Sequence, residues 1–341
     1  DNGDEIESLQ SVKYYAPRRY ASQHRAVTAS DYEAILPTVY SNIESVSAYG
    51  GEDLDPPQYG RVFIAAKPRN GNFLSDFTKQ NILNDLKQYA IAGINQRIED
   101  LKILYVELDS FVYYNNSIMD DKDQLKAEVS TSLTEYGRSA NLNAFGGRFK
   151  YSESQRIIDQ TDSAITSNIT KVTIRRDLKA LINQSAQYEL CFGNQFNVKT
   201  SGGTIKSTGF GISGVEGEVY FTDIPRSDGL MGDIAVFKPA TSATEDAVVV
   251  VPNAGTVDYV KGEVILNTIN ISSTVKDNDI IEIQAYPESN DVIGLKDIYL
   301  SLDMSNTTIN IVRDTISSGQ QISGIGYKVT SSYSNGSLIR Q

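Results

Sequence analysis

The amino-acid sequence changes character near residue 178, and this change constrains the fold more than any single motif. Before it, apolar residues alternate in strand-like runs such as 104–114, or recur at helical spacing, as after Asp121. Beyond it, Gly, Ser, Thr and Asn become frequent, and short β-prone runs replace the helical periods. We therefore predict an α+β chain in which a mixed α/β domain precedes a β-rich domain.

The part before residue 178 alternates strands with helices. Two strands separated by a Gly- and Pro-rich loop predict a hairpin, and the order of elements is ββα followed by βααβ. This order favours a split α/β sandwich with two ferredoxin-like halves over a doubly wound parallel sheet. The predicted strands cover residues 43–49, 59–66, 104–114 and 170–175, and the predicted helices begin at Ser75, at Asp121 and, with a Ser152-x-x-Gln155 capping box, at Ser152.

The part after residue 178 is predicted to be a β-sandwich or an irregular barrel, as one domain or as two subdomains. Turn-forming residues recur at short intervals, and no repeat of fixed period is evident. The run Ala247–Val251 would be an aggregation hazard at an open sheet edge, so we expect it to lie centrally in a sheet or under another subunit. The predicted strands are 188–192, 195–199, 217–222, 233–237, 247–251, 262–266, 280–286, 298–302, 308–312 and 326–330.

The first 37 residues are predicted to form an N-terminal arm and a short capped helix. Pro17 fixes φ and disfavours a helical residue before it, so the basic arm around Arg18, Arg19 and Arg25 is expected to be extended. The domains expected from the sequence are therefore 1–37, 38–178 and 179–341.

The helix that follows the arm has clear local signals. Thr28 is a favourable N-cap, and Asp31 is an acidic capping-box partner. Val27 and Tyr32 have the spacing of a hydrophobic staple, and Pro37 is expected to end the helix after about two turns. We interpret this stretch as a docking device without chemical function, and its candidate interaction residues are Pro17, Arg18, Arg19, Arg25, Thr28, Asp31 and Tyr32.

The composition argues against nucleic acid and membrane as partners. The net charge is −12 and the isoelectric point is about 4.7, so the chain is a poor ligand for a phosphate backbone. The local basic patch of Lys13, Arg18, Arg19, His24 and Arg25 is interpreted as a site for an acidic protein surface or as a solvated arm. No apolar run approaches the roughly 18 residues of a membrane helix and no secretory signal is present, so we expect a soluble protein made inside the cell. Because the first residue is Asp1 and not Met, we expect a fragment of a longer polypeptide.

Motifs that resemble ligand sites lack the context that those sites require. Gly209–Gly214 matches G-x-G-x-x-G, but a strand-like run follows it where a dinucleotide site needs a helix, so a flexible β-hairpin is the better interpretation. Asp120–Asp123 and Asp277–Asp279 lack the glycine and glutamate of a calcium-binding EF-hand loop. His24 has no carboxylate or nucleophile beside it in the sequence, and the single Cys191 is interpreted as a buried structural thiol. We predict no catalytic residue, no cofactor and no metal.

A family resemblance lies in the segment around the predicted N-terminal helix. Ala16-Pro17, followed by RAVTASDYEA at residues 25–34, resembles the "AP…RAVT-x-x-DYE" segment of baseplate J-like proteins, which are wedge components of contractile phage tails and related injection machines. The order of elements up to about residue 176 is also similar to that of the baseplate wedge proteins of T4-type phages.

The resemblance implies a late structural protein of the virion that is assembled in the host cytoplasm and located in the tail baseplate. It implies a homodimer that joins other wedge proteins in a six-fold ring around the tail tube, and a ring that rearranges when the sheath contracts. No enzymatic activity is expected.

The residues alone leave two other classes open. A β-rich receptor- or glycan-binding tail module fits the second half of the chain, and an enzyme could assemble its site from carboxylates that are distant in sequence. The chain has no Trp to stack on sugars, and its 20 Tyr and 11 Phe residues are spread through strands and helices. We interpret these aromatic residues as core and interface.

Overall fold

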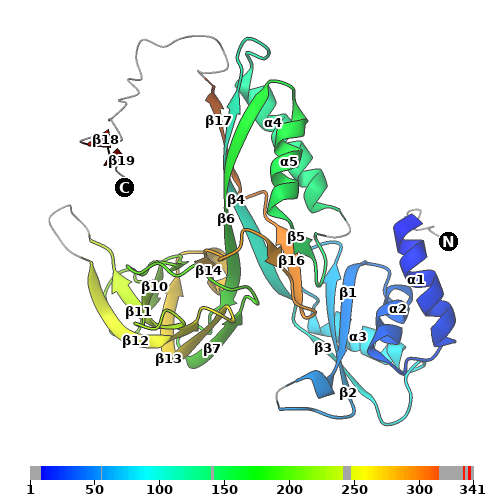
Figure 1. The fold of residues 1–341 in the computed structure, drawn as a ribbon. Coiled ribbons are helices and arrows are strands. Elements are labelled where there is room, and N and C mark those ends of the chain that lie inside the picture. The colour runs from blue at the N-terminus through cyan, green and yellow to red at the C-terminus, as the bar shows by residue number, and fades with distance from the viewer. Residues whose placement is uncertain are drawn as a thin grey trace.

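The computed structural model describes residues 9–54, 56–139, 142–240 and 247–314, together with the short strands β18 (Tyr333–Ser334) and β19 (Ser337–Leu338). Figure 1 shows an N-terminal lobe of helices and a small sheet, a long central pair of strands covered by two helices, and a curled β-rich lobe. One hydrophobic cluster fills the N-terminal lobe, and a second is shared by the central part and the β-rich lobe. The predicted α+β class is confirmed.

The N-terminal lobe packs helices on a three-stranded sheet in the order β1-β2-β3. The first two strands form the predicted antiparallel hairpin, and β3 lies parallel to β2. Tyr32, Leu36, Ile64 and Leu86 are fully buried between the helices and the sheet. Burial of each such apolar side chain contributes about 1.5–3 kcal/mol, which explains why these short elements are stable together. The elements are α1 (Leu9–Ser22), α2 (Ala29–Val39), β1 (Ile43–Gly50), η1 (Gly51–Asp53), β2 (Arg61–Pro68), α3 (Asp76–Leu86) and β3 (Asn95–Glu99).

The N-terminal arm is helical, which corrects the predicted extended conformation. Pro17 lies inside α1, at a cost of roughly 3 kcal/mol for a proline in a helix interior. Because α1 packs against α2, tertiary contacts outweigh this local cost. The second helix likewise continues beyond Pro37, and the Thr38 hydroxyl donates a hydrogen bond of 2.6 Å to the carbonyl of Ile35.

The central part is built on two long antiparallel strands, β4 and β6, which pair from Leu104 opposite Arg176 to Tyr114 opposite Ile165. The helices α4 and α5 pack against each other, and α5 also packs against β6 (Figure 1). Asp121 caps α4 as predicted, but the capping box at Ser152 is wrong because α5 already begins at Tyr151. The elements are β4 (Lys102–Tyr114), α4 (Lys122–Gly137), β5 (Arg148–Phe149), α5 (Tyr151–Thr161) and β6 (Ile165–Lys179).

The last long strands return to the central part. β16 (Ile298–Leu302) and β17 (Thr308–Arg313) pair in parallel with the outer edge of β4. Both strands lie after the sequence boundary at residue 178, and their pairing with β4 joins them to the sheet of the central part. The apolar side chains of Ile298 and Leu300 are fully buried there, so closing the edge of β4 also completes the second core. The two ferredoxin-like halves are not confirmed.

The β-rich lobe extends the same sheet, so that strands run in the order β16-β4-β6-β14-β8-β10-β11-β12-β13-β7, with β9 on β13. All pairs except those of β16 and β17 with β4 are antiparallel. The sheet curls in this lobe (Figure 1). The elements are β7 (Ser185–Cys191), β8 (Ile205–Ser207), β9 (Phe210–Ile212), β10 (Tyr220–Pro225), β11 (Met231–Lys238), β12 (Val248–Asp258), β13 (Glu263–Thr274), η2 (Asp277–Asp279), β14 (Ile280–Ala285) and β15 (Val292–Ile293).

Most predicted strands of this lobe are present, with two exceptions. Residues 195–199 do not form a strand, because only Phe196 makes an isolated bridge, to Pro287. The predicted strand 326–330 lies outside the described residues. None of the helices in the described part of the chain combines the length and the apolar character that a bilayer crossing requires.

Candidate functional site

The basic residues predicted to dock a partner lie on and after α1. Arg18 donates a hydrogen bond of 2.8 Å to the carbonyl of Tyr14, and its guanidinium lies 3.7 Å from the centre of the Tyr14 ring. Arg19 is also on α1, and Arg25 lies in the turn before α2; all three arginines are exposed. Helix α1 and the turn after it therefore present the three arginines on one segment of the chain, with no acidic residue between Leu9 and Arg25.

The other predicted interaction residues have roles inside the lobe. The Asp31 carboxylate accepts hydrogen bonds of 2.8 Å from the backbone of Thr28 and 3.1 Å from that of Val27, so it caps the start of α2. Tyr32 is 0 % exposed, and its hydroxyl accepts a hydrogen bond of 2.9 Å from Gln96. Burial raises the pKa of Tyr32. Thr28, Asp31 and Tyr32 thus fix the helix and its packing, and a partner could contact only the first two directly.

A groove of about 380 Å³ lies beside this surface. One wall comes from α1 and α2, its floor is the outer edge of β1, and the other wall comes from the loop around Phe145 and from Lys296. The Glu33 carboxylate accepts a hydrogen bond of 2.9 Å from the backbone of Ala48 at this edge. Burial raises the pKa of Glu33, and the charges of Arg18 and Lys296 oppose this shift. The groove is lined by residues of both the N-terminal lobe and the central part.

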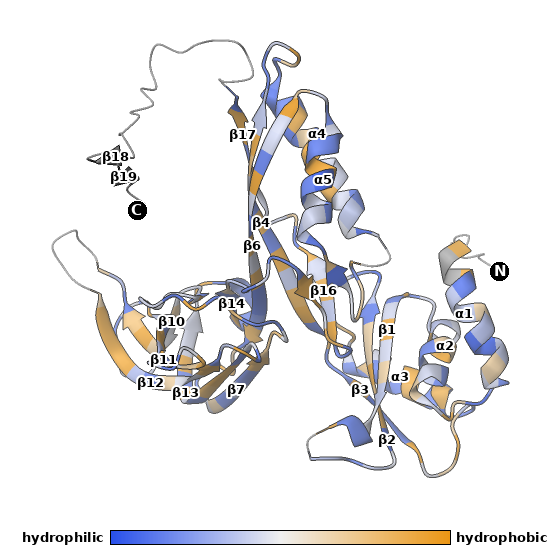
Figure 2. Cartoon of the chain, viewed as in Figure 1, coloured by the Kyte–Doolittle hydropathy of each residue, from blue (hydrophilic) through white to orange (hydrophobic). Residues whose placement is uncertain are grey.

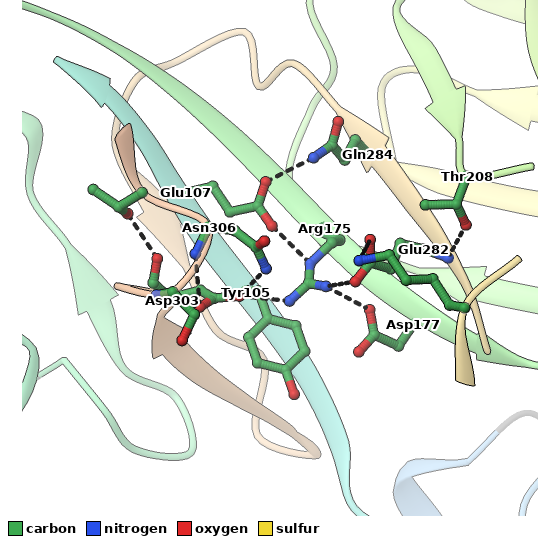
Figure 3. A network of polar contacts seen from close by, with 12 residues as sticks. Tyr105, Glu107, Arg175, Asp177, Thr208, Glu282, Gln284, Asp303 and Asn306 are labelled. Carbon is green, nitrogen blue, oxygen red and sulfur yellow. Dashed lines mark hydrogen bonds and ion pairs between the residues drawn. The ribbon is translucent and has the colours of Figure 1, made fainter. Parts of the chain in front are cut away.

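Sequence reasoning missed the main polar cluster of the chain, which surrounds Arg175 on β6 (Figure 3). The residue is 4 % exposed. Its guanidinium nitrogens lie 2.7 Å from Glu107, 2.6 Å from Asp303 and 3.3 Å from Asp177. Glu282 forms a fourth ion pair. We call this cluster the Arg175 junction, because its members come from β4, β6, β14 and the loop after β16.

The junction contains more acidic than basic groups. Lys276 adds a second cation at 3.1 Å from Glu282, and the Tyr105 ring centre lies 4.3 Å from the Arg175 guanidinium. Gln284 donates a hydrogen bond of 2.7 Å to Glu107.

Burial raises the pKa of the Glu107 carboxyl and of the Asp177 carboxyl, and Arg175 opposes both shifts. Burial also raises the pKa of Tyr105 to about 12. One arginine therefore holds together four carboxylates that would repel one another without it.

The loop after β16 is organised by the same cluster. Asp303 accepts backbone hydrogen bonds of 2.9 Å from Ser305 and 3.3 Å from Asn306, and the Asn306 side chain donates another of 2.8 Å. The Thr307 hydroxyl donates to the Asp303 carbonyl at 2.7 Å. The sequence carries two signals of a buried ion cluster. Arg175 and Arg176 are adjacent within β6, and Glu107 lies within β4.

The rejected motifs have structural roles. The Gly209–Gly214 segment contains β9, and Phe210 and Val219 exchange backbone hydrogen bonds of 3.0 and 2.8 Å, which agrees with the predicted hairpin. His24 lies in the turn after α1 with a φ of 59°. Cys191 is half-buried at the end of β7, and burial raises its pKa. Among the described residues, no three acidic, histidine or cysteine side chains are placed to hold a metal ion.

Comparison with known proteins gives two matches that follow the structural division. Residues 28–99 match C-terminal domain I of the baseplate structural protein gp6, and residues 102–177 match C-terminal domain III of the same protein. The first range covers the N-terminal lobe from α2 to β3, without α1, and the second runs from β4 to β6. Both models are of gp6, which refines the resemblance to baseplate J-like proteins.

Individual proteins are also similar to parts of this chain. The baseplate wedge protein gp6 of Enterobacteria phage T4 is 23% identical over 181 residues, which are 52% of this chain and 27% of the T4 protein. The chain thus spans about a quarter of the length of this relative. A chain in the baseplate of the anti-feeding prophage has 17% identity and a TM-score of 0.36, over 49% of this chain and 37% of that one. Residues 28–177 are therefore similar, across two neighbouring units, to C-terminal domains I and III of the baseplate structural protein gp6.

Proposed function

We propose that this chain forms part of a baseplate wedge by associating with itself and with other wedge proteins in a six-fold ring around the tail tube. The observation that carries the proposal is the tandem match to gp6 domains I and III across residues 28–177. Homodimer contacts from both the α/β part and the β-rich lobe would produce a continuous ring rather than closed, separate dimers. The role is structural, as the names of the relatives state for those proteins.

A rearrangement of the ring on sheath contraction is part of the proposal. The link between the N-terminal lobe and the central part is short, since β3 ends at Glu99 and β4 begins at Lys102. Polar contacts join the two units: the Tyr299 hydroxyl donates a hydrogen bond of 3.0 Å to Glu44, and Asn72 donates one of 3.3 Å to the hydroxyl of Tyr105. Two cores joined by a short link and by polar contacts can change their relative position without opening either core.

The basic surface of α1 supplies a docking contact in this proposal. Lys13, Arg18, Arg19 and Arg25 concentrate positive charge on one segment, while the whole chain has a net charge of −12. An acidic surface of another wedge subunit is the partner that this charge fits.

Electron microscopy and light scattering of the purified chain, alone and with its neighbouring wedge proteins, test the proposal. We expect dimers or ring-shaped assemblies. A chain that stays monomeric in both preparations would overturn it.

The docking surface is tested by reversing Arg18, Arg19 and Arg25 to Glu. These side chains are exposed, so we expect unchanged thermal unfolding and weaker assembly. The matched control reverses three exposed charges elsewhere: Lys122, Lys126 and Arg138. Normal assembly of the first variant would rule out the docking role of α1.

A further inference from the structure

The strand β12 begins with Val248–Val251, and this valine run has a paired strand on one side only. β11 pairs along the run. On the other side, β13 pairs with β12 only between Gly255 and Asp258, and its later residues pair with β7 and β9. Within the residues that the structure describes, the valine run is therefore an open edge of the large sheet.

The open edge is apolar and carries no charge. Val248 is 60 % exposed and Val249 is 49 % exposed, while Val250 and Val251 pack partly against the large core. Figure 2 colours this end of β12 as hydrophobic. No charged residue occurs between residues 247 and 257. Proteins normally protect such edges with charged side chains, with bulges or with a covering segment.

The following residue limits the length of the open edge. Pro252 has no backbone N–H to donate, so a strand that pairs with this edge can continue the hydrogen-bond ladder only along the four valines. A ligand for this surface must therefore be a short extended strand with apolar side chains.

We propose that this edge pairs with the same edge of a second copy of the chain, antiparallel and across a two-fold axis. A second strand would replace water as the hydrogen-bond partner of the backbone groups along this edge. A run of four identical residues is self-complementary in this orientation, because valine then faces valine in each register that keeps the two runs together. The absence of charge also lets the two copies meet here although each has a net charge of −12.

The inference rests on the proposed self-association and names the surface that would carry it. The matches to gp6 cover residues 28–99 and 102–177, so the valine run lies outside both domain models. Four valines bury less than the roughly 1,200–2,000 Å² of a stable interface, so we expect a weak dimer of the isolated chain whose geometry the strand pairing fixes.

The first experiment measures self-association by sedimentation velocity over a concentration series. Val249→Lys places two lysines at the paired edge, and we expect the dissociation constant of the dimer to rise at least tenfold. Val260→Lys is the matched control, because Val260 is similarly exposed at 52 % in the turn between β12 and β13, at the other end of β12. We expect the control to dimerise like the parent chain.

The second experiment tests the register directly. Single cysteines replace Val248, Val249, Val250 or Val251, and a cysteine at Val260 serves as the control. In an antiparallel self-pair across a two-fold axis, either one position faces its own copy or each valine faces a different valine of the second copy, so the single-cysteine chains are also mixed in pairs, such as Val249→Cys with Val250→Cys. We expect oxidised dimers from this run and none above the parent level, set by Cys191, from the control.

Each outcome decides between the inference and the proposed function. Dimerisation of Val249→Lys equal to that of the parent, together with cross-links only at other sites, would refute the valine edge and leave self-association intact. A parent chain that stays monomeric at all concentrations but assembles with other wedge proteins would also refute the edge, while the wedge function would stand. A folded chain that neither dimerises nor assembles with other wedge proteins would refute both the valine edge and the wedge function.

Discussion

The two cores of this chain are completed in opposite ways. The N-terminal lobe closes around a cluster of apolar side chains that includes Leu36 and Ile64. The second core borders the Arg175 junction, where one buried arginine meets four carboxylates. An apolar core loses stability in proportion to the atoms removed, whereas an ion cluster fails when its shared cation is missing, because the carboxylates around it stay buried and unpaired. We interpret the junction as the element that specifies which strands meet.

The largest expected effect follows from Arg175→Met. Removal of the guanidinium leaves Glu107, Asp177, Glu282 and Asp303 close together, with Lys276 beside Glu282 as the remaining cation of the junction. We expect a loss of about 3–5 kcal/mol in the free energy of unfolding, measured by urea denaturation. Hydrogen exchange should show faster opening of β14 and of β16 than of the N-terminal lobe. Equal destabilisation of both units would contradict the local role of the junction.

Leu36→Ala tests the apolar side of the comparison. Leu36 is fully buried in the first core, and truncation of such a leucine typically costs about 2–5 kcal/mol. The same hydrogen-exchange experiment should now show faster opening of the N-terminal lobe, with β14 and β16 protected as in the parent chain. The two variants together show whether the cores unfold separately; a parallel loss of protection in both units would show that they unfold as one.

Thr28→Ala tests how much the N-cap of α2 contributes to the stability of the N-terminal lobe. Loss of a threonine N-cap typically costs about 1 kcal/mol. Asp31 would still accept the backbone hydrogen bonds of Val27 and Thr28, so the helix should stay formed. Circular dichroism during thermal unfolding measures the change. A cost near zero would show that Asp31 alone caps α2.

Asp177→Asn should have the smallest effect, and its sign depends on pH. Burial raises the pKa of Asp177 in the folded chain above its unfolded value, so its contribution to stability is complete below the unfolded pKa and is lost as pH rises through the folded pKa. We therefore expect the parent and the variant to be nearly equal in stability at pH 4, and the variant to be slightly more stable at pH 7. Urea denaturation at both pH values measures the difference. A less stable variant at pH 7 would show that the ion pair with Arg175 outweighs burial.

Local signals predicted the elements well and their partners poorly. The hairpin of β1 and β2, the cap of Asp121 and the long strand β4 follow from periodicity and from turn residues that act within a few positions. The helical arm around Pro17 was missed because packing of α1 on α2 decides its conformation, and packing is not visible in local propensity.

The candidate site shows the same limit. The cap formed by Asp31 was predicted, since it is local. The burial of Tyr32 and the ion pairs of Arg175 were not, because they depend on residues far away in sequence, such as Gln96 and Asp303. Similarly, alternation identified β16 and β17 as strands, but it could not tell that both join β4.

Because β16 and β17 pair with β4, the edge of β4 can be completed only after the β-rich lobe has been synthesised. Lys102 pairs with Asp297 across 195 positions, and Leu108 meets Thr307 across 199. During synthesis, the edge of β4 therefore stays unpaired until the whole β-rich lobe has left the ribosome, and contacts of such long range form slowly. The nascent chain would carry an exposed strand edge for most of its synthesis, which is the period in which a chaperone or an early assembly partner would protect it best.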